Sequence, residues 1–357
     1  MKRSLAVKRR GASIRRLLAL LAVIAMSAPG AALAQDTAAK CQLVQVADWP
    51  VRLAHGKILL DGTVNGHEVG IAIDTGSEKT VIFRSSAQRL GLALRDVPGV
   101  RFFGFGGGTR AQAADIDEIT IAGATRKGMR VFVAGENDQS SWGDLVLGED
   151  FLASVDVEFD LAHKAVRLFQ PRGCEGVSLA YWASDGGSSV DIDPVSDVNP
   201  KIRLKVEVNG VAIDAMLDSG ASRSILDSGY ARQVGVTPDT PGVRPSGKIG
   251  GIGARTTDAW RGTFATFVIG NERIRDADLE FADFRRVHEE RTGSHVTMSS
   301  LQAEPMVLGA DFIRSHRVLV SHTKHRMYFS YVGGPAFGVA PGGEEAASRN
   351  AGGGTSR

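Results

Sequence analysis

Short apolar runs, interrupted by turn residues, dominate the pattern of the chain and favour strands over helices. Residues 64–73 and 206–217 each contain apolar stretches next to an Asn-Gly pair, at 65–66 and 209–210. Asn-Gly between apolar runs is the strongest short signal for a β-hairpin, because both residues tolerate the positive φ of a tight turn. We therefore predict a hairpin in each segment.

Other segments have the same strand-like character. Residues 116–121 and 264–269 alternate apolar and polar side chains, which is the period of a strand with one buried face. Residues 159–169 predict a hairpin that turns at 162–164, with a later counterpart that turns at 323–325. Gly accounts for 43 of the 357 residues and aromatic residues for 6%, as in a turn-rich chain. The predicted fold class is all-β with a few short helices.

Helices are predicted in two kinds of place only. One kind lies at residues 85–90 and 230–234. The other follows a Leu-Gly-x-Asp motif, where Asp150 and Asp311 are expected to be the N-cap residues. A carboxylate at that position accepts hydrogen bonds from the N–H groups that the first helical turn leaves without a partner.

The chain repeats itself. Residues 71–92 align without gaps to residues 215–236, at a constant shift of 144, so that Asp74 and Asp218 occupy the same place. The correspondence continues through two glycine-rich segments and two Leu-Gly-x-Asp motifs, with insertions in the second copy. The larger insertion falls within 285–300, a polar stretch that predicts a surface loop.

The repeat indicates two copies of one domain joined by a linker rich in Gly, Ser and Asp. A Gly/Ala/Ser-rich tail, expected to be disordered, follows the second copy. The predicted organisation is a signal peptide, a first half, a linker, a second half and a tail, at residues 1–34, 35–172, 173–198, 199–332 and 333–357.

The N-terminal segment has the pattern of an export signal. A basic stretch precedes ten apolar residues at 17–26, and Ala32-Leu33-Ala34 supplies a small-x-small cleavage site. Ten residues are too few to cross a bilayer, which takes roughly 20. We expect cleavage near Gln35, export to the periplasm or secretion, and no membrane span afterwards; an uncleaved anchor is the alternative.

Composition and charge exclude several classes of protein. Hydrophobic residues make up 43% of the chain and charged residues 23%, which argues against a polytopic membrane protein and against general disorder. Residues 1–34 hold seven Lys and Arg and no acid, so the remainder has 35 basic and 40 acidic residues, a net charge of −5. A nucleic-acid partner is not expected, because such a protein normally keeps a basic surface.

Cys41 and Cys174 are the two cysteines, and both lie after the signal segment. An even number of cysteines in an oxidising compartment predicts one disulfide. Two free buried thiols are the alternative, and a pair so far apart is not a zinc motif.

Each copy contains two apolar residues followed by Asp-Thr/Ser-Gly, at residues 74–76 and 218–220. This doubled motif resembles the aspartic proteases. The glycine-rich segment 248–253 and the Thr80 that follows Asp74 by six residues resemble the retroviral, retropepsin-like branch of that family. The resemblance covers nearly all of residues 49–332 and implies a duplicated retropepsin/pepsin-like acid-protease fold.

The resemblance implies that Asp74 and Asp218 form a catalytic pair, the dyad. Two carboxylates about 3 Å apart cannot both ionise, so they share one proton. The ionised member activates a water and the protonated member donates to the carbonyl oxygen of the peptide bond, without cofactor or metal. In supporting roles we expect Thr75 and Ser219, whose hydroxyls interlock beneath the dyad, and Gly76 and Gly220, which let backbone approach the carboxylates.

The family also implies a protein or peptide substrate bound in extended form, beneath two mobile flaps. A single chain would act as a monomer whose halves form a pseudo-dimer. Residues 104–108 and 250–253 are the predicted flaps, and Phe102 and Ile249 are expected to line substrate pockets beside them. The flap and substrate-binding residues expected from the resemblance are Glu78, Phe103, Gly104, Phe105, Gly106, Gly250, Gly251, Ile252 and Gly253.

Alternatives remain at this point. Asp227-Ser228-Gly229 matches the short motif but has no Asn-Gly upstream, so we interpret it as a decoy. The two Asp-x-Gly turns are also compatible with a duplicated β-domain without catalysis, a silent peptide-binding module, or a structural envelope protein. His316, His322 and His325 are interpreted as surface histidines rather than a metal site.

Overall fold

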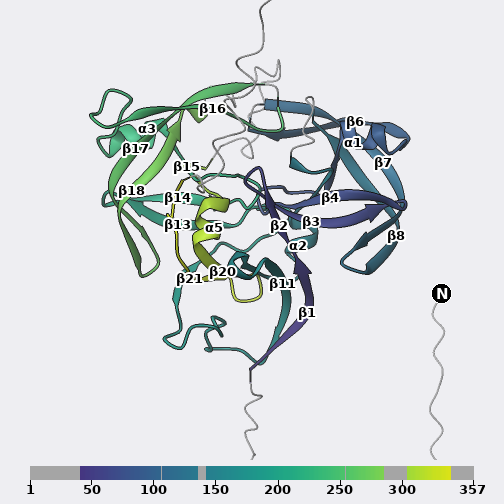
Figure 1. Cartoon of the computed structure of the whole chain (residues 1–357), viewed down its shortest axis with the longest axis horizontal. Coiled ribbons are helices and arrows are strands. Elements are labelled where there is room, and N and C mark those ends of the chain that lie inside the picture. Colours follow the sequence, from purple (N-terminus) through teal and green to yellow (C-terminus); the bar gives the residue numbers. More distant parts are fainter. Residues whose placement is uncertain (1–40, 106, 136–141, 254, 285–303, 339–357) are drawn as a thin grey trace, which may run out of the picture. The chain divides into compact units, whose positions relative to one another are not determined.

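The structure is a computed structural model that describes residues 41–105, 107–135, 142–253, 255–284 and 304–338. The predicted signal peptide, the predicted insertion loop and Gly106 lie outside these residues. The described residues form three β-sheets and four short α-helices, which confirms the all-β prediction (Figure 1). None of the described helices is long and apolar enough to cross a membrane.

The first half builds an eight-stranded sheet in the order β2-β3-β4-β9-β5-β8-β7-β6. Its strands are β2 (Arg52–Ala54), β3 (Lys57–Val64), β4 (His67–Ile73), β5 (Val81–Phe83), β6 (Leu94–Gly104), β7 (Gly107–Ile121), β8 (Ala124–Ala134) and β9 (Leu145–Leu147). Strands β4 and β9 are parallel neighbours, so the C-terminal ends of both strands lie at the same end of the sheet.

The second half repeats this path in a seven-stranded sheet of order β13-β14-β19-β15-β18-β17-β16. Its strands are β13 (Arg203–Val208), β14 (Val211–Leu217), β15 (Ile225–Asp227), β16 (Arg244–Gly250), β17 (Thr256–Ile269), β18 (Glu272–Ala282) and β19 (Met306–Leu308). Again β14 and β19 are parallel. The duplication seen in the sequence is therefore a duplication of strand order.

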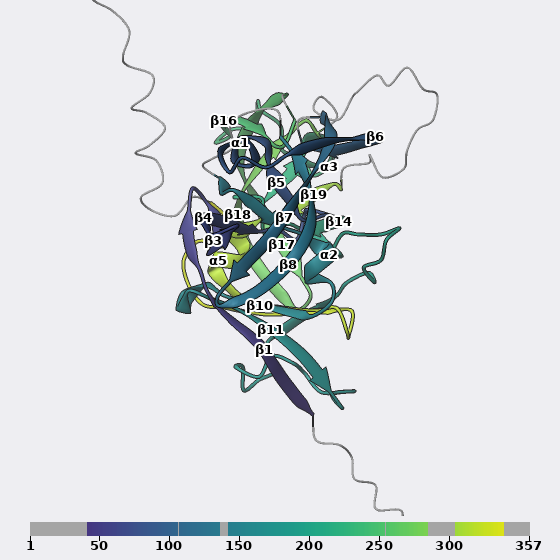
Figure 2. The same ribbon diagram turned by 90° about the vertical axis from the view of Figure 1, so that its right-hand side faces the viewer.

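The third sheet has six strands and contains segments of both halves, in the order β1-β11-β10-β20-β21-β12. Its strands are β1 (Gln42–Pro50), β10 (Asp156–Asp160), β11 (Ala165–Arg172), β12 (Ser188–Asp191), β20 (His316–Ser321) and β21 (Arg326–Tyr331). Figure 2 shows β1, β11 and β10 side by side. The halves meet where Phe159 of β10 pairs with Val318 of β20. Strand β12 belongs to the predicted linker and pairs with β21.

The predicted hairpins are confirmed. Asn65 and Asn209 have φ of 50° and 47°, and each is followed by a Gly with φ of 80° or 83°. Both residues of each turn are thus left-handed, as a two-residue hairpin turn requires. The hairpin β10–β11 turns through the 3₁₀ segment η2 (Leu161–His163), and β20–β21 is its counterpart.

The helices lie close to their predicted places, but one detail was wrong. Helices α1 (Arg84–Arg89) and α3 (Ser228–Gln233) follow β5 and β15, and α2 (Glu149–Leu152) and α5 (Ala310–Ser315) follow β9 and β19. The N-caps of α2 and α5 are Gly148 and Gly309, not Asp150 and Asp311. Each aspartate is the second residue of its helix, and its carboxylate binds hydroxyl and N–H groups of another loop, described below.

One hydrophobic core extends through both halves. Phe159, Phe312 and Phe329 are among its fully buried side chains. The start of the predicted tail belongs to it as well, because Phe337 is 5% exposed and its ring lies 4.9 Å from that of Phe267. Residues 333–338 are therefore part of the fold, in contrast to the disorder expected there; the rest of the tail lies outside the described residues.

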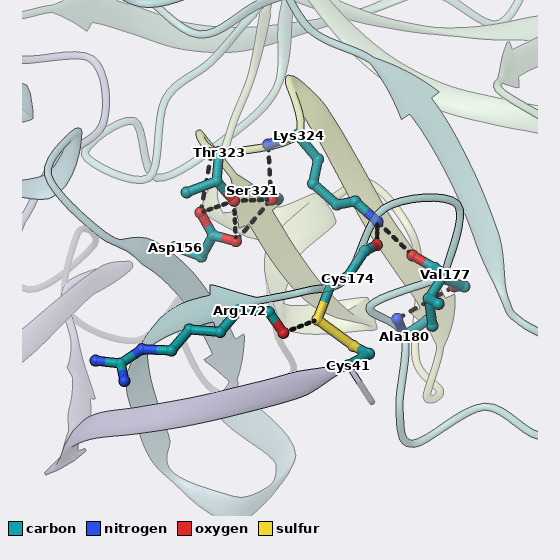
Figure 3. The surroundings of a disulfide bond; sticks show 10 residues. Cys41, Asp156, Arg172, Cys174, Val177, Ala180, Ser321, Thr323 and Lys324 are labelled. Atoms are coloured by element: carbon teal, nitrogen blue, oxygen red, sulfur yellow. Dashed lines mark hydrogen bonds between the residues drawn. A yellow bond between two sulfur atoms is a disulfide. The ribbon is translucent and has the colours of Figure 1, made fainter. Parts of the chain in front are cut away.

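A disulfide joins Cys41, just before β1, to Cys174, just after β11 (Figure 3). Close to it, Lys324 of the β20–β21 turn donates hydrogen bonds from Nζ to the carbonyl oxygens of Cys174 and Val177. The disulfide therefore closes the first half at the edge of the sheet shared by both halves.

Candidate active site

The loops that follow β4 and β14 carry Asp74 and Asp218. The Asp74 N–H donates to the carbonyl oxygen of Leu147 at 3.1 Å, and the Asp218 N–H donates to that of Leu308 at 2.9 Å. Each aspartate is thus fixed to the neighbouring parallel strand of its own sheet. Both side chains are partly buried.

The structure brings the two aspartates together. A Cβ placed on Gly220 would lie 2.2 Å from Cγ of Asp74, and one on Gly76 would lie 2.4 Å from Cγ of Asp218. Such distances leave no room for any side chain, so both positions require glycine. Each half therefore supplies one carboxylate that lies against the backbone of the other half, and the two carboxylates share a hydrogen bond.

Backbone N–H groups orient the two carboxylates. Gly76 donates to Oδ1 of Asp74 at 2.8 Å, and Ala221 donates to Oδ1 of Asp218 at 2.9 Å. The donors differ by one position between the copies, so the two carboxylates are not equivalent. Ser77 follows Gly76 in the first copy where Ala221 follows Gly220, and the Ser77 hydroxyl donates to the Lys79 carbonyl rather than to the dyad.

Thr75 and Ser219 interlock beneath the dyad. Their hydroxyls donate across to the other half, from Thr75 Oγ1 to the Leu217 carbonyl at 3.0 Å and from Ser219 Oγ to the Ile73 carbonyl at 2.8 Å. Each hydroxyl also accepts the backbone N–H of the other residue. Both side chains are buried, so these bonds join the halves where water does not compete.

A second layer of hydrogen bonds holds each aspartate loop against a helix. Asp150 accepts from the N–H and the hydroxyl of Thr80, both at 2.8 Å. Asp311 accepts the same two groups from Ser224, at 2.8 and 2.6 Å. This use of the carboxylates explains why they do not cap their helices.

Asp74 favours its protonated form. Removal of its carboxyl from water is the largest cause, the charge of Asp218 acts in the same direction, and together they raise the pKa of Asp74 to about 7. Lys57 and the Gly76 N–H oppose the shift. The pair therefore retains a proton over the acid range in which an isolated aspartate would have lost it.

Lys57 lies beside the dyad, a position that the sequence pattern around it does not predict. Its Nζ donates to the Gly220 carbonyl and lies 4.4 Å from the centre of the Trp142 ring. Burial lowers the pKa of Lys57, while the charges of Asp74 and Asp218 raise it. In the sequence, the shift of 144 aligns Lys57 with Lys201, so the repeat has a lysine at this position in both copies. The apolar and polar pattern around these lysines, however, does not connect them with the aspartates.

Glu149 and His322 form a second buried feature that the sequence did not indicate. Glu149 Oε2 lies 3.8 Å from His322 Nε2, and the side chains are 2% and 7% exposed. None of their four polar atoms has a hydrogen-bond partner among the described residues. Burial, with the charges of Asp74 and Asp150, raises the pKa of Glu149 to about 8. Burial, with the charge of His325, lowers the pKa of His322 to about 4.

The assignment of the histidines to the surface was therefore wrong for two of the three. The His322 side chain is only 7% exposed, and His316, whose Nε2 lies 2.8 Å from Glu272 Oε1, is fully buried. His325 is exposed in the hairpin turn. Among the described residues, no group of three or more His, Cys, Asp and Glu side chains is placed to hold a metal ion.

The predicted flaps are the ends of the hairpins β6–β7 and β16–β17, and they meet. The Gly253 N–H donates to the Phe105 carbonyl at 3.2 Å, and Gly104 and Gly251 fit against Ile252 and Phe105, where a Cβ would collide. Gly250 and Gly104 end β16 and β6.

Each flap end packs on the other half. Phe105 joins an apolar cluster of the second half, with its ring 5.4 Å from that of Phe284, and Ile249 belongs to the same cluster. Ile252 joins the cluster of the first half that contains Phe83 and Phe102. The apolar flap residues thus contact each other's domains in this closed arrangement.

Other predicted residues lie apart from the dyad or outside the description. Glu78 is exposed on the loop after Asp74, and its counterpart is Ser222. The backbone of Phe103 pairs with Gly108, and Gly106 is not among the described residues. Asp227 of the decoy motif caps α3, where it accepts the N–H groups of Gly229 and Phe284.

Comparison with known proteins identifies one matching family. The family described as "Aspartyl protease" matches residues 60–151 and 204–312, which together are more than half of the chain. A crystal structure of the aspartic proteinase from Irpex lacteus is similar over 80% of this chain and 97% of its own, with 13% identity and a TM-score of 0.45. No curated protein sequence matches.

Proposed function

Because the chain belongs to the aspartyl protease family, we propose that it is an endopeptidase that hydrolyses peptide bonds with Asp74 and Asp218. One observation carries this proposal: the two carboxylates come from different halves and face each other across Gly76 and Gly220, where they share a hydrogen bond. A binding module would need neither carboxylate, and bringing two of them together in a partly buried site costs stability.

The chemistry follows from the shared proton. The ionised member of the pair removes a proton from a bound water, and the water oxygen attacks the carbonyl carbon of the peptide bond. The protonated member donates to the carbonyl oxygen at the same time, which gives a tetrahedral diol. The carboxyl that took the proton of the water then passes a proton to the amide nitrogen as the C–N bond breaks, and the other carboxylate recovers its proton from a hydroxyl of the diol as the carbonyl re-forms. The N–H groups of Gly76 and Ala221 hold the carboxylates in place, and the Thr75–Ser219 interlock fixes the distance between the halves. The titration belongs to the pair rather than to either residue.

The substrate class that fits is an extended peptide. Strand edges of the flap hairpins offer backbone groups for pairing, and the apolar residues at the flap ends offer contacts for alternate side chains. The flaps contact each other in this structure, so substrate entry requires them to part. We further propose that the enzyme is exported to the periplasm or secreted and acts as a monomer; the export-type N-terminus and the Cys41–Cys174 disulfide support export.

The test is cleavage of a denatured protein by the purified chain, followed by mass spectrometry of the fragments. Asp74→Asn and Asp218→Asn are each expected to lower the rate by about 10³-fold or more while thermal stability stays nearly unchanged. Asp227→Asn is the control for the decoy motif: asparagine keeps an oxygen for the helix cap but loses the acceptor for the Phe284 N–H, so a small loss of stability without loss of cleavage is expected. A pepstatin-like inhibitor should block the wild type.

Binding of the peptide without cleavage would replace the proposal with a silent binding module. Cleavage that persists in both dyad variants would mean that another site, or a contaminating peptidase, does the chemistry.

A further inference from the structure

Lys57 reaches the dyad by a path that crosses between the halves. The β2–β3 turn of the first half lies against the second half, where a Cβ on Gly56 would lie 2.5 Å from Cβ of Ser222. The next residue, Lys57, then donates from Nζ to the carbonyl of Gly220. Gly220 is the residue whose backbone lies against the Asp74 carboxylate. The ammonium is therefore held next to both aspartates.

The surroundings of the ammonium keep it there. The Trp142 ring, 4.4 Å from Nζ, attracts a cation through its negative face. Among the described residues, the charges that shift the pKa of Lys57 are the carboxylates of Asp74 and Asp218, and the hydrogen bond to Gly220 uses one of its three N–H donors.

We propose that Lys57 is a positioning residue of the dyad: its ammonium, fixed between the Gly220 carbonyl and the Trp142 ring, supplies the positive charge that favours the ionised carboxylate of the Asp74–Asp218 pair. This inference rests on the proposed peptidase function. A cation a few ångströms from a carboxylate stabilises its charged form, and the effect is large where water is partly excluded.

Among the described residues, the charges that shift the pKa of Asp74 are those of Asp218 from the opposite loop and Lys57 from β3. Glu149 on α2 is coupled to the same site, because the charge of Asp74 helps to raise its pKa. The charge of Asp218 opposes ionisation of Asp74, whereas the charge of Lys57 and the hydrogen bond from the Gly76 N–H favour it. Glu149 stays neutral over the acid and neutral range because its own pKa is raised to about 8. The positive charge of Lys57 therefore offsets the mutual repulsion of the two aspartates and lowers the pH at which the pair becomes singly ionised.

Three substitutions separate the charge of Lys57 from its hydrogen bond. Lys57→Gln keeps a donor for Gly220 without the charge, Lys57→Met removes both, and Lys57→Arg keeps the charge. Lys127→Met is the control, because Lys127 is 79% exposed on β8 and lies 3.7 Å from Glu118. Loss of the positive charge should raise the apparent pKa values of the pair by about 1 unit.

The first measurement is the pH profile of kcat/KM. In K57Q and K57M both limbs should move about 1 pH unit higher, so that at a given pH on the acid limb the rate falls about tenfold and on the alkaline limb it rises about tenfold. K57R and K127M should follow the wild type. If K57Q follows the wild type and only K57M is impaired, at all pH values alike, the lysine merely ties the Gly220 loop and the proposal is wrong.

The second measurement does not need turnover. NMR of aspartate labelled with ¹³C at the carboxyl carbon, with D74N and D218N as assignment references, follows the titration of the pair directly. The same upward shift is expected in K57Q, and titration curves identical to wild type would overturn the inference. A wild type without peptidase activity would refute the proposed function, while the titration would still decide the role of Lys57 independently. If K57Q and K57M do not fold, Trp142→Leu, which frees the ammonium, should give a smaller shift in the same direction, and no shift would overturn the proposal.

Discussion

Thr75 and Ser219 bind each other across the line between the two halves, each backbone N–H donating at 3.0 Å to the hydroxyl of the other residue. With the two hydroxyl-to-carbonyl bonds, four buried hydrogen bonds cross between the halves at this point. Because the residues directly precede Gly76 and Gly220, the same bonds fix the spacing of the dyad. Stability and catalytic geometry are therefore coupled here.

Removing one of these hydroxyls should weaken the joint. Thr75→Val and Ser219→Ala each leave a buried N–H and a buried carbonyl without their partner, which costs about 1–3 kcal/mol in the free energy of unfolding. Urea unfolding measures the loss. Ser219→Thr and Thr75→Ser keep the hydroxyl and should retain most of the stability. Thr120→Val is the control, since that hydroxyl bonds Thr125 on the surface. Equal losses of unfolding free energy in T75V and T120V would show that the interlock stabilises the fold no more than a surface hydrogen bond does.

The proposed activity should decline as the pH rises through about 7. Asp74 carries the raised pKa, so above this value the pair loses the proton that the carbonyl oxygen must receive. We expect kcat/KM to fall about tenfold per pH unit beyond that point. Initial rates from pH 3 to pH 9 on one peptide check this. An activity that keeps rising to pH 9 would show that the pair does not hold its proton as described.

Glu149 gives stability a second pH dependence. Its pKa is raised from 4.5 to about 8 on folding, so the folded chain holds a proton that the unfolded chain releases. The corresponding stability is fully present below about pH 4.5 and is lost as the pH rises through about 8. Glu149→Gln cannot ionise and should therefore match the wild type at pH 4 and exceed it by up to about 4 kcal/mol at pH 8.5. Thermal unfolding at both pH values, with the exposed Glu68→Gln as control, tests this.

His322 has the opposite dependence. Its pKa falls from 6.5 to about 4 on folding, so the unfolded chain takes up a proton that the folded chain refuses. This contribution is present above about pH 6.5 and is lost as the pH falls through about 4. His322→Gln should be as stable as the wild type at pH 7.5 and more stable, by up to about 3 kcal/mol, at pH 4. A variant whose advantage is the same at both pH values would show a packing effect rather than a proton.

The disulfide should stabilise the fold through the unfolded state. Cys41 and Cys174 are 133 residues apart, and closing a loop of that size contributes about 4–5 kcal/mol by the chain-entropy estimate. Reductant should lower the urea midpoint of the wild type and leave the double variant Cys41→Ser, Cys174→Ser unchanged. Mass spectrometry of non-reduced peptides supplies the direct check, and only free thiols in protein made under oxidising conditions would refute the bridge.

Much of the fold could be predicted because its signals are local. The Asn-Gly turns define hairpins within ten residues, and the repeat of Asp-Thr/Ser-Gly at a constant shift pairs Asp74 with Asp218 before any contact is known. The role predicted for Asp150 was wrong for a related reason. A carboxylate near the start of a helix is a local signal for an N-cap. The carboxylate of Asp150 instead accepts hydrogen bonds from Thr80, which lies 70 residues away in the sequence.

The rest of the site could not be predicted, because it depends on contacts between the halves. Lys57 begins an ordinary strand, and only the docking of the β2–β3 turn against the second half brings it to Gly220. Glu149 and His322 lie on segments whose own patterns indicate a helix and a turn. Their burial arises from the packing of one half on the other, which no periodicity within either half records.

The joint between β10 and β20 also bears on how a newly made chain folds. Phe159 pairs with Val318, so this contact must wait until almost all of the second half has been synthesised. Long-range strand pairing is slow, because the chain loses the entropy of closing a large loop before the stabilising contacts form. During that interval β10 is an edge strand. Its unpaired backbone groups, and side chains that are buried in the finished fold, are then open to pairing with other strands. The same strand pair that unites the two halves is thus the point at which two unfinished chains would most readily misassemble with each other.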